Sequence, residues 1–375
     1  MKVLLVSDAG SIHTRRWASS LKDAGVDVVL FSITPVEDDF YGRKDIRTYV
    51  FDLFRYKKKK KIPGLGSLAS HVCAVRELKK VLREECPDIL HAHYATSYGL
   101  IAALSGYRPF ILSVWGSDVY EFPKQSVLNG LAVKFMMKKA DRVLSTSRVM
   151  AAEASRYCSK DIGITPFGVD TELFVKDSGH VREAGCLVFG TVKTLSHKYG
   201  IDLLIKAFAA MRKMLEDDAA MKGISARLVI AGKGPDRDAL VKLADDLGMA
   251  ESVEFIGAVD HEMIPELYSG IDVAVFLSRS ESFGVSAVEA MSCSVPVIAS
   301  DAVGFREILD DGAGIIVPGE DVRAAAREMY RLAKDPGARE SLAGKGRRRV
   351  EERYDWKTNV EMMMEEYENI LRTRL

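Results

Sequence analysis

The sequence predicts an α/β protein built from two doubly wound parallel-sheet domains in tandem, and three observations lead to this class. A chain of 375 residues is too long for one ordinary hydrophobic core. Short β-branched runs alternate with amphipathic stretches, which is the pattern of parallel strands joined by crossover helices. The alternation occurs twice, and a segment with Pro166, Gly168 and many polar residues separates the two series.

The individual elements follow from this pattern in chain order. The first series has strand-like runs at 2–7, 26–32, 87–93 and 109–115, with helical stretches at 14–25 and 97–106. After an expected linker at 164–185, the second has strand-like runs at 186–192, 226–232, 252–258, 272–278, 296–300 and 314–318, with helical stretches at 203–218 and 239–248. The last segment, 354–375, has the spacing of an amphipathic helix that needs another surface to cover it.

Composition bounds the setting of the protein. The apolar runs are short and fall below the roughly 20 residues of a membrane-spanning helix. The beginning of the chain, MKVLLVSDAG, is strand-like and lacks the pattern of a signal peptide. The five cysteines form no CxxC pair and show no disulfide spacing. We therefore expect a globular protein in a reducing, cytoplasmic setting.

The net charge of zero hides an asymmetry between the two halves. Residues 1–165 contain 26 Lys and Arg against 17 Asp and Glu, whereas the remainder contains 27 against 36. The most basic run has five consecutive lysines at 57–61, with Phe54, Tyr56, Ile62 and Leu65 nearby. The region Phe54–Leu65 resembles a surface that docks on anionic lipid, which predicts peripheral association with the inner face of the cytoplasmic membrane. A solvated loop is the alternative. A nucleic-acid partner is not expected, because the second half is acidic and no nucleic-acid-binding motif is present.

The stretch ESFGVSAVE, residues 281–289, carries the most specific chemistry. A strand is expected to end near Leu277 and a helix to begin around Gly284 to Ser286. The free N–H groups of a first helical turn attract phosphate, and Gly284 permits close backbone approach. Because acids would repel phosphate, Glu281 and Glu289 are expected to hold hydroxyls, of a sugar and of a ribose respectively.

Glu289 has a plainer interpretation, since a helical Glu is most often a solvated residue. Its neighbours argue against exposure, because an unpaired charge in apolar surroundings is costly. Those neighbours are Ala287, Val288, Ala290 and Met291.

The stretch 281–289 resembles the E-x7-E signature of the retaining glycosyltransferases of family 4, which have the GT-B fold of two Rossmann-like domains facing a cleft. Other segments resemble the family in the same order, namely HAHYATSYGL, SVWGSDV, ADRVLSTSRVMA, ITPFGVDTELF, GTVKTLSHKYGIDLLIKAF, LVIAGKGPDRDAL, VEFIGAVDHEMIPELYSGIDV and DAVGFREILDDGAGIIVPGED. The resemblance covers nearly the whole chain. It implies an acceptor-binding domain at 1–168, a nucleotide-sugar-binding domain at 169–355, and a terminal helix at 356–375 that crosses back to the first domain.

The resemblance also implies roles for residues of the second domain. Glu281 would contact the donor sugar, Glu289 the ribose, and the backbone at Ala258 and Val259 the base. The amides that would meet the sugar and phosphates are those of Phe283, Gly284 and Val285. The cations that neutralise the diphosphate would be Lys193 and Lys198, although the family commonly has an Arg a few residues before the position of Lys193.

In the first domain, the resemblance places Gly10 and Ser11 where a glycine-rich loop approaches the phosphates. Trp115 stands where many relatives carry a His, so the corresponding polar contact would come from His93 or Asp118. His91 and His93 lie two apart on one strand, which suits a metal pair geometrically. The sequence offers no third ligand with suitable spacing.

The activity that the resemblance implies is transfer, with retained anomeric configuration, of a hexose or N-acetylhexosamine from a nucleotide-diphosphate sugar. UDP is expected more than GDP. The acceptor would be a glycan, a glycolipid or a small hydroxyl compound, in cell-surface polysaccharide or glycolipid biosynthesis. No DxD motif stands at a strand end, so we expect neither a metal nor any cofactor besides the sugar nucleotide.

Three alternatives stay open from the sequence. Gly232 and Gly234 form a Gly-x-Gly that suggests an NAD(P)-dependent oxidoreductase, but the third glycine and the ribose-binding acid are missing. A sugar-nucleotide epimerase would use the same fold for other chemistry. A binding subunit without catalysis is the third, which the apparently complete donor site disfavours.

Overall fold

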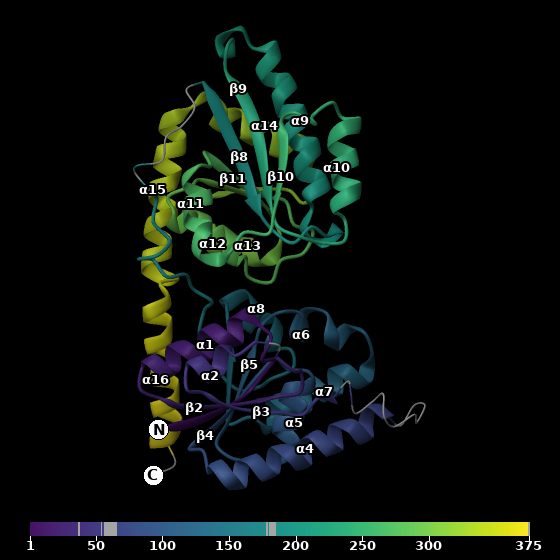
Figure 1. Ribbon diagram of the computed structural model, residues 1–375, viewed down its shortest axis with the longest axis vertical. Coiled ribbons are helices and arrows are strands. Elements are labelled where there is room, and N and C mark those ends of the chain that lie inside the picture. The colour runs from purple at the N-terminus through teal and green to yellow at the C-terminus, as the bar shows by residue number, and fades with distance from the viewer. Residues whose placement is uncertain (37, 54, 56–65, 178, 180–184, 374–375) are drawn as a thin grey trace. The chain divides into compact units, whose positions relative to one another are not determined.

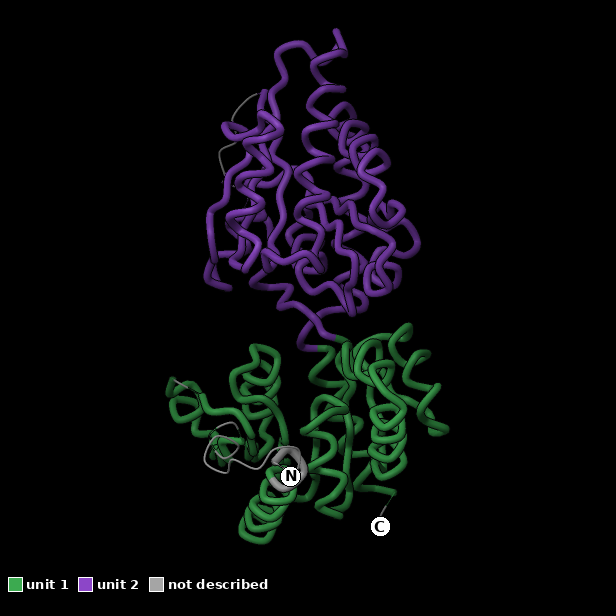
Figure 2. Tube along the Cα trace, turned by 90° about the vertical axis from the view of Figure 1, so that its right-hand side faces the viewer, with its two compact units in different colours: residues 1–166, 358–375 green, residues 167–357 purple. Residues whose placement is uncertain are grey.

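The computed structural model describes residues 1–36, 38–53, 55, 66–177, 179 and 185–373 (Figure 1). The chain forms two compact units, coloured separately in Figure 2. Unit 1 comprises Met1–Pro166 and Thr358–Leu375, and unit 2 comprises Phe167–Lys357. Apart from Arg55, the basic region 54–65 lies outside the described residues, and so do 178 and 180–184 of the expected linker.

Unit 1 is built on a seven-stranded, entirely parallel sheet in the order β3-β2-β1-β4-β5-β6-β7. The strands are β1 (Lys2–Val6), β2 (Asp27–Ser32), β3 (Arg47–Val50), β4 (Ile89–His93), β5 (Phe110–Val114), β6 (Arg142–Ser145) and β7 (Ile162–Ile164). Its helices are α1 (Ile12–Asp23), α2 (Phe40–Arg43), α4 (Gly66–Glu85), α5 (Ser97–Ser105), α6 (Ser117–Tyr120), α7 (Val127–Lys139) and α8 (Arg148–Ala154), with a 3₁₀ turn η1 (Phe122–Lys124).

Unit 2 repeats this design with a six-stranded parallel sheet in the order β10-β9-β8-β11-β12-β13. The strands are β8 (Cys186–Val192), β9 (Ser225–Ala231), β10 (Val253–Gly257), β11 (Val273–Phe276), β12 (Val297–Ser300) and β13 (Ile315–Val317). Its helices are α9 (Ile201–Asp217), α10 (Arg237–Asp246), α11 (Ile264–Ser269), α12 (Val285–Ser292), α13 (Val303–Ile308), α14 (Val322–Lys334) and α15 (Pro336–Arg353). The described part of the unit also contains the 3₁₀ turns η2 (His197–Tyr199), η3 (Ala219–Met221), η4 (His261–Met263) and η5 (Asp310–Gly312).

The terminal helix α16 (Trp356–Arg372) belongs to unit 1 from Thr358 onward. Its Tyr367 is fully buried and lies with its hydroxyl 2.7 Å from His91 Nδ1 on β4. Its Glu366 accepts two hydrogen bonds from the Arg142 guanidinium of β6, at 2.8 and 2.7 Å. The amphipathic end of the chain is therefore attached to β4 and β6 of unit 1 by a buried hydrogen bond and an ion pair.

The sequence prediction of two doubly wound parallel sheets is confirmed. The central strands were recognisable because strands buried on both faces are almost continuously apolar, as in β1 and β5. The short strands β3, β6 and β7 were not predicted as strands. They have three or four residues each, and β3 leaves its side chains half-buried or exposed.

In both sheets the strand order reverses between two adjacent strands, β1 and β4 in unit 1 and β8 and β11 in unit 2. We call this position the switch point of each sheet. Chain crossovers leave to opposite sides there, so the loops at the carboxyl ends of these strands leave space for a ligand. Among the described helices, none is both long enough and apolar enough to cross a membrane.

Candidate active site

Two of the residues selected from the sequence, Lys193 and Glu281, lie together at the switch point of unit 2. Lys193 follows β8 directly, and Glu281 lies in the turn after β11, the neighbour of β8. Lys193 Nζ lies 2.6 Å from Glu281 Oε2, and the two side chains are only 11% and 12% exposed. The charges of this pair are therefore balanced locally in the protein as it stands. Lys193 Nζ also lies 4.8 Å from the centroid of the Tyr199 ring, a cation–π contact.

Three glycines bring the backbones around this pair into direct contact. A Cβ on Gly200 would lie 1.9 Å from the Leu277 carbonyl oxygen, and one on Gly232 would lie 1.9 Å from that of Lys193. At Gly234 a Cβ would lie 2.1 Å from the Leu195 carbonyl oxygen. The loops after β8, β9 and β11 thus touch where any side chain would intrude. The Gly-x-Gly that suggested a dinucleotide site serves this packing.

Lys198 lies on η2, in the loop after β8 that also carries Lys193. Its carbonyl oxygen accepts the Arg279 backbone N–H at 2.8 Å, which ties η2 to the turn after β11. Its Nζ lies 5.9 Å from the centroid of the Tyr199 ring. The ring of Tyr199 therefore lies near both lysine ammonium groups.

Arg279 holds this loop in place and was missed from sequence. Its guanidinium donates two hydrogen bonds to the Asp202 carboxylate, at 2.7 and 2.8 Å. It also donates to the His197 carbonyl oxygen at 2.7 Å and to the Glu320 carboxylate at 2.6 Å. Burial alone would raise the pKa of Asp202, but the Arg279 guanidinium lowers it below its usual range. The signal that could have found Arg279 is its place between a strand end and the first acid of E-x7-E.

The turn leading into α12 has the shape expected from sequence. Gly284 adopts φ +103° immediately before the helix begins at Val285. A Cβ on Gly284 would lie 2.8 Å from the Phe305 ring, and one on Gly304 would lie 2.5 Å from the Phe283 backbone nitrogen. The two glycines allow α13 to pack on the turn. The amides of the first turn of α12 lack acceptors within the helix, as at every helix N-terminus.

The Phe283 side chain is part of the core of unit 2. It is 3% exposed and its ring lies edge-to-face with those of Phe167 and Tyr354, with centroids 5.7 Å apart in both pairs. The ring fixes the turn, so a donor would meet Phe283 only through its backbone.

Glu289 is buried rather than solvated, which excludes the plainer interpretation of this residue. It is 6% exposed, and its Oε1 lies 3.3 Å from Nε2 of His261 on η4. The His261 ring in turn lies 5.2 Å from that of Phe174. His261 was also missed from sequence, because nothing local to it indicates a partner on α12.

The expected base-contacting residues lie just before His261. Gly257 closes β10 with φ +79°, and Ala258 is exposed after it. Val259 is half-buried and lines a cavity of about 360 Å³ together with Ile256 and Met263. The contact between His261 and Glu289 therefore ties the loop that carries Ala258 and Val259 to the helix that carries Glu289.

Unit 1 has its own switch point, where Gly10 and Ser11 lie in the turn from β1 into α1. Gly10 is exposed and donates its N–H to the Asp8 carboxylate at 3.0 Å. Among the described residues, a Cβ added at Gly10 would come within 4 Å of Asp8 Oδ1 alone, at 3.4 Å. Ser11 precedes the first residue of α1 and is half-buried.

His93, at the end of β4, belongs to an aromatic cluster. Its Nδ1 lies 3.1 Å from Ser7 Oγ, and its ring lies 4.4 Å from that of Trp115. The His13 ring lies 6.0 Å from the same Trp115. Burial lowers the pKa of His93 well below its ordinary value. Burial, helped by the nearby positive charge of Arg16, lowers the pKa of His13 to about 4. Both rings are therefore neutral at pH 7.

His91 is a satisfied core histidine. It is fully buried, with Nδ1 2.7 Å from the Tyr367 hydroxyl and Nε2 2.8 Å from Ser113 Oγ. Burial lowers its pKa to about 3. Since both ring nitrogens are occupied, His91 does not form a metal pair with His93. Within the described part of the chain, no group of three or more His, Cys, Asp or Glu side chains is arranged to hold a metal ion.

Asp118 differs from its expected role as a direct contact to the donor. It is fully buried, and its carboxylate accepts the backbone N–H groups of Ala95 at 2.8 Å, Gly116 at 2.7 Å and Trp115 at 3.2 Å. Burial raises its pKa to about 6, although these N–H donors act to lower it. Asp118 therefore joins the loops that follow β4 and β5, and its oxygens are not open to a ligand.

Known glycosyltransferases resemble this chain in sequence and in fold. Residues 2–147 match a family model described as glycosyl transferase 4-like, and residues 179–349 match one described as glycosyl transferases group 1. The D-inositol 3-phosphate glycosyltransferase of Actinosynnema mirum is 28% identical, over 90% of this chain and 87% of that protein. The N-acetyl-α-D-glucosaminyl L-malate synthase of Bacillus anthracis is 26% identical, over 78% and 77%.

A solved structure shows the same fold. HepE from Anabaena, solved in complex with UDP, has a TM-score of 0.80 at 19% identity and is matched over 98% of this chain and 100% of its own. The paired Rossmann-like units have the GT-B fold, and the two family models identify the chain as a glycosyltransferase. The chain belongs to glycosyltransferase family 4, since both family models describe glycosyltransferases and together span both units.

Proposed function

We propose that this glycosyltransferase takes its sugar from a nucleotide-diphosphate donor bound by unit 2 and transfers it with retention to a hydroxyl acceptor bound by unit 1. The observation that carries the proposal is the Lys193–Glu281 ion pair at the switch point, next to the N-terminus of α12. An ammonium and bare amides suit a diphosphate, and a carboxylate suits sugar hydroxyls. One small region therefore offers both halves of a nucleotide sugar their preferred partners.

The ion pair also suggests how binding proceeds. Without donor, Lys193 and Glu281 neutralise each other. The arriving diphosphate would compete for Lys193 and release Glu281 toward the hydroxyls of the donor sugar. Glu289, held by His261, would accept from the ribose. The backbone at Ala258 and Val259 would face the base.

Departure of the nucleoside diphosphate develops negative charge, and the rate depends on groups already positioned to receive it. Lys193, Lys198 and the first turn of α12 supply these groups, with Arg279 keeping Lys198 in position. In this proposal no metal is required. For retention we favour a front-face route in which the leaving phosphate helps to deprotonate the acceptor hydroxyl.

The proposed donor is a UDP-hexose or UDP-N-acetylhexosamine, which is supported by the HepE structures with UDP and with UDP-glucose. Among the acceptor classes expected from sequence, we favour a small anionic hydroxyl compound. The names of the two relatives specify inositol 3-phosphate and L-malate, both anionic. The basic excess of residues 1–165 fits such an acceptor.

The nucleotide is tested by thermal unfolding with UDP, GDP and their sugar conjugates, since a ligand of the native state raises Tm. We expect UDP to raise Tm more than GDP. Product analysis by NMR with a bound UDP-sugar and candidate acceptors then tests transfer and retention. Absence of any shift with every nucleotide diphosphate would refute the donor proposal, and an inverted product would refute retention. A free epimerised nucleotide sugar would instead identify the epimerase alternative.

Membrane association stays a proposal that rests on the basic region 54–65. Co-sedimentation with vesicles that contain or lack anionic lipid tests it, using a variant with glutamine at all five of the positions 57–61. Equal sedimentation of this variant and the unchanged chain on anionic vesicles would remove the claim for this region.

A further inference from the structure

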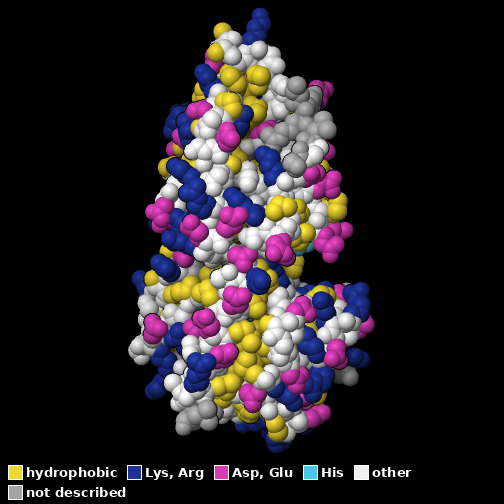
Figure 3. All heavy atoms as spheres, turned by 90° about the vertical axis from the view of Figure 1, so that its left-hand side faces the viewer, with side chains coloured by type: hydrophobic (Ala, Val, Ile, Leu, Met, Phe, Trp, Pro, Cys, Tyr) yellow, Lys and Arg dark blue, Asp and Glu magenta, His cyan; other side chains and the backbone are white. Residues whose placement is uncertain are grey.

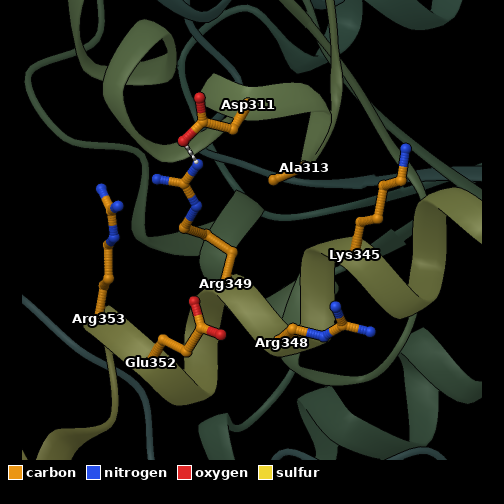
Figure 4. Close-up of a pocket in the computed structure, with 7 residues that line it drawn as sticks. All are labelled: Asp311, Ala313, Lys345, Arg348, Arg349, Glu352 and Arg353. Carbon is orange, nitrogen blue, oxygen red and sulfur yellow. Dashed lines mark hydrogen bonds and ion pairs between the residues drawn. The ribbon is translucent and has the colours of Figure 1, made fainter.

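A basic pocket lies in unit 2 outside the proposed donor site, between α15 and the turn η5 (Figure 4). Its volume is about 340 Å³. The residues that line it are Asp311, Ala313, Lys345, Arg348, Arg349, Glu352 and Arg353. None of them belongs to the proposed donor site, so the function proposed above does not account for the pocket.

Arg349 is the buried member of this set. It is 6% exposed, and its Nη2 donates to the Asp310 carbonyl oxygen at 2.7 Å and to the Asp311 carboxylate at 2.8 Å. Its Nη1 is buried and has no hydrogen-bond partner among the described residues. An unsatisfied buried donor costs about 1–3 kcal/mol, and more when it is charged. This nitrogen therefore calls for an acceptor that the surrounding side chains do not supply.

The other cations flank Arg349 along α15, with Arg353 on one side and Lys345 on the other (Figure 4). Lys345, Arg349 and Arg353 follow one another at intervals of four and so share one face of α15. In Figure 4 these three side chains rise from α15 on the side of the turn that carries Asp311. Lys345 and Arg353 are exposed, and no ion pair of either is found in the described part of the chain. Like charges at this spacing repel one another unless an anion lies between them.

The acids of the lining do not neutralise the pocket. Four cationic side chains face two carboxylates, and the Asp311 carboxylate is already engaged by Arg349 Nη2. Figure 3 shows the side of the molecule that carries α15, where Lys and Arg side chains are interspersed with Asp and Glu over unit 2. The positive charge of the pocket lining is therefore not part of a broad basic surface on this side of unit 2.

We propose that this pocket binds a phosphate-bearing anion, with Arg349 Nη1 as its buried donor, Arg353 beside it and Lys345 adding positive charge from the other side. A phosphate group offers several acceptor oxygens and a double charge, which suits one guanidinium fork with further cations around it. Arg348 at the rim adds to the same field. Free phosphate or a phosphomonoester and the phosphate of a lipid headgroup share this chemistry.

The first experiment titrates the full chain with inorganic phosphate by calorimetry. The exposed double variant Lys345→Gln/Arg353→Gln leaves Arg349 and its structural contacts intact, and Arg349→Met removes the buried donor. We expect either variant to weaken phosphate binding about tenfold, the size of a lost charge-assisted hydrogen bond. Arg327→Gln is the matched control, since Arg327 is exposed on α14 and does not line the pocket.

A second arm separates the two sources of phosphate. Vesicles of phosphatidylcholine with and without phosphatidylglycerol are sedimented with the unchanged chain, the double variant and the control. Binding to inorganic phosphate that depends on Lys345 and Arg353 supports a free ligand. Anionic-vesicle binding that falls in the double variant supports a headgroup. If the double variant and Arg349→Met match the Arg327→Gln control in both assays, the proposal is overturned, whatever the strength of binding at other sites.

Discussion

The two units share one topology but have opposite chemistry at their switch points. In unit 2 the loops after β8 and β11 meet through ion pairs, Lys193 with Glu281 and Arg279 with Asp202. In unit 1 the loops after β1, β4 and β5 meet through His93, Ser7 and the half-buried Trp115, and through the Asp118 carboxylate, which pairs with backbone N–H groups and with no cationic side chain among the described residues. The doubly wound sheet thus decides where a ligand meets the protein, and the loop residues decide which chemistry it meets.

The difference fits the separate roles proposed for the two units, with the nucleotide bound by unit 2 and the acceptor by unit 1. Charge develops on the nucleotide when a glycosidic bond breaks, so the unit proposed to hold the nucleotide needs positioned cations. The unit proposed to hold the acceptor meets no such developing charge, so its loops need shape and hydrogen bonds, while its basic excess attracts an anionic acceptor. Asp118 illustrates the second case, since its buried carboxylate shapes two loops instead of meeting a ligand. Substitutions in unit 2 should therefore alter turnover or the KM for the donor, whereas the substitutions in unit 1 described below should alter stability.

The largest effect is expected from the charged switch point. Lys198→Ala or Glu281→Ala should lower turnover about 10²–10³-fold, because each removes a group that receives charge or sugar in the transition state. Initial rates of nucleotide diphosphate release measure this, with circular dichroism to confirm folding. Lys213→Ala and Glu340→Ala, exposed residues of the same unit, are the controls. Near-normal rates in the Lys198 or Glu281 variant would contradict the assignment.

Arg279→Ala should have a smaller effect, about tenfold on the KM for the donor, because Arg279 acts only by holding the loop of Lys198. Arg279→Lys should not restore the value, since an ammonium cannot make the two-pronged contact with Asp202. Glu320→Ala removes the more exposed partner of Arg279 and should change little. An equal rise in the donor KM of the Arg279 and Glu320 variants would contradict this explanation. It would show that the hydrogen bonds from Arg279 to Asp202 and His197 do not determine donor binding.

The neutral histidines of unit 1 predict a loss of stability in acid. The folded-state pKa of His91 is about 3, below the ordinary value of 6.5, so the unfolded chain binds a proton first as the pH falls. Between pH 7 and pH 5 this costs roughly 2 kcal/mol. Asp118 acts in the opposite sense, because its raised pKa of about 6 makes the folded state the stronger proton binder below pH 6.

The test compares urea unfolding of the unchanged chain and His91→Gln at pH 7 and pH 5. The variant starts from lower stability at pH 7, because it disturbs the contacts with Tyr367 and Ser113. Its further loss at pH 5 should be roughly 2 kcal/mol smaller than that of the unchanged chain. Parallel losses in the two proteins would mean that His91 does not remain neutral in the folded state.

The smallest effect concerns the terminal helix. Tyr367→Phe removes the hydroxyl at His91 Nδ1 and should lower the free energy of unfolding by about 1 kcal/mol, the typical worth of a hydrogen bond. Glu368→Gln, which removes an exposed ion pair with Arg372, should lower it by much less. Chemical unfolding monitored by tryptophan fluorescence compares the two. Equal stability of both variants would show that the Tyr367 hydroxyl contributes nothing to the attachment of α16.

The sequence by itself determined the doubled α/β class, most central strands and the segments that end at the switch points. These rest on local patterns, since a buried parallel strand is continuously apolar and the turn into α12 requires Gly284. The sequence also selected Lys193, Lys198, Glu281 and Glu289 through one compact signature and its family resemblance. The short strands β3, β6 and β7 escaped because each has too few residues to show a period.

Only the tertiary structure decided which of the polar residues are paired with one another. Arg279 meets Asp202, Glu289 meets His261, and His91 meets Tyr367, in each case across a long stretch of chain. The same holds for Asp118, which looks like any loop acid until the backbone N–H groups around it are placed. Which side chains pair depends on which distant segments the sheet brings together. A local sequence pattern does not tell which distant segments become neighbours.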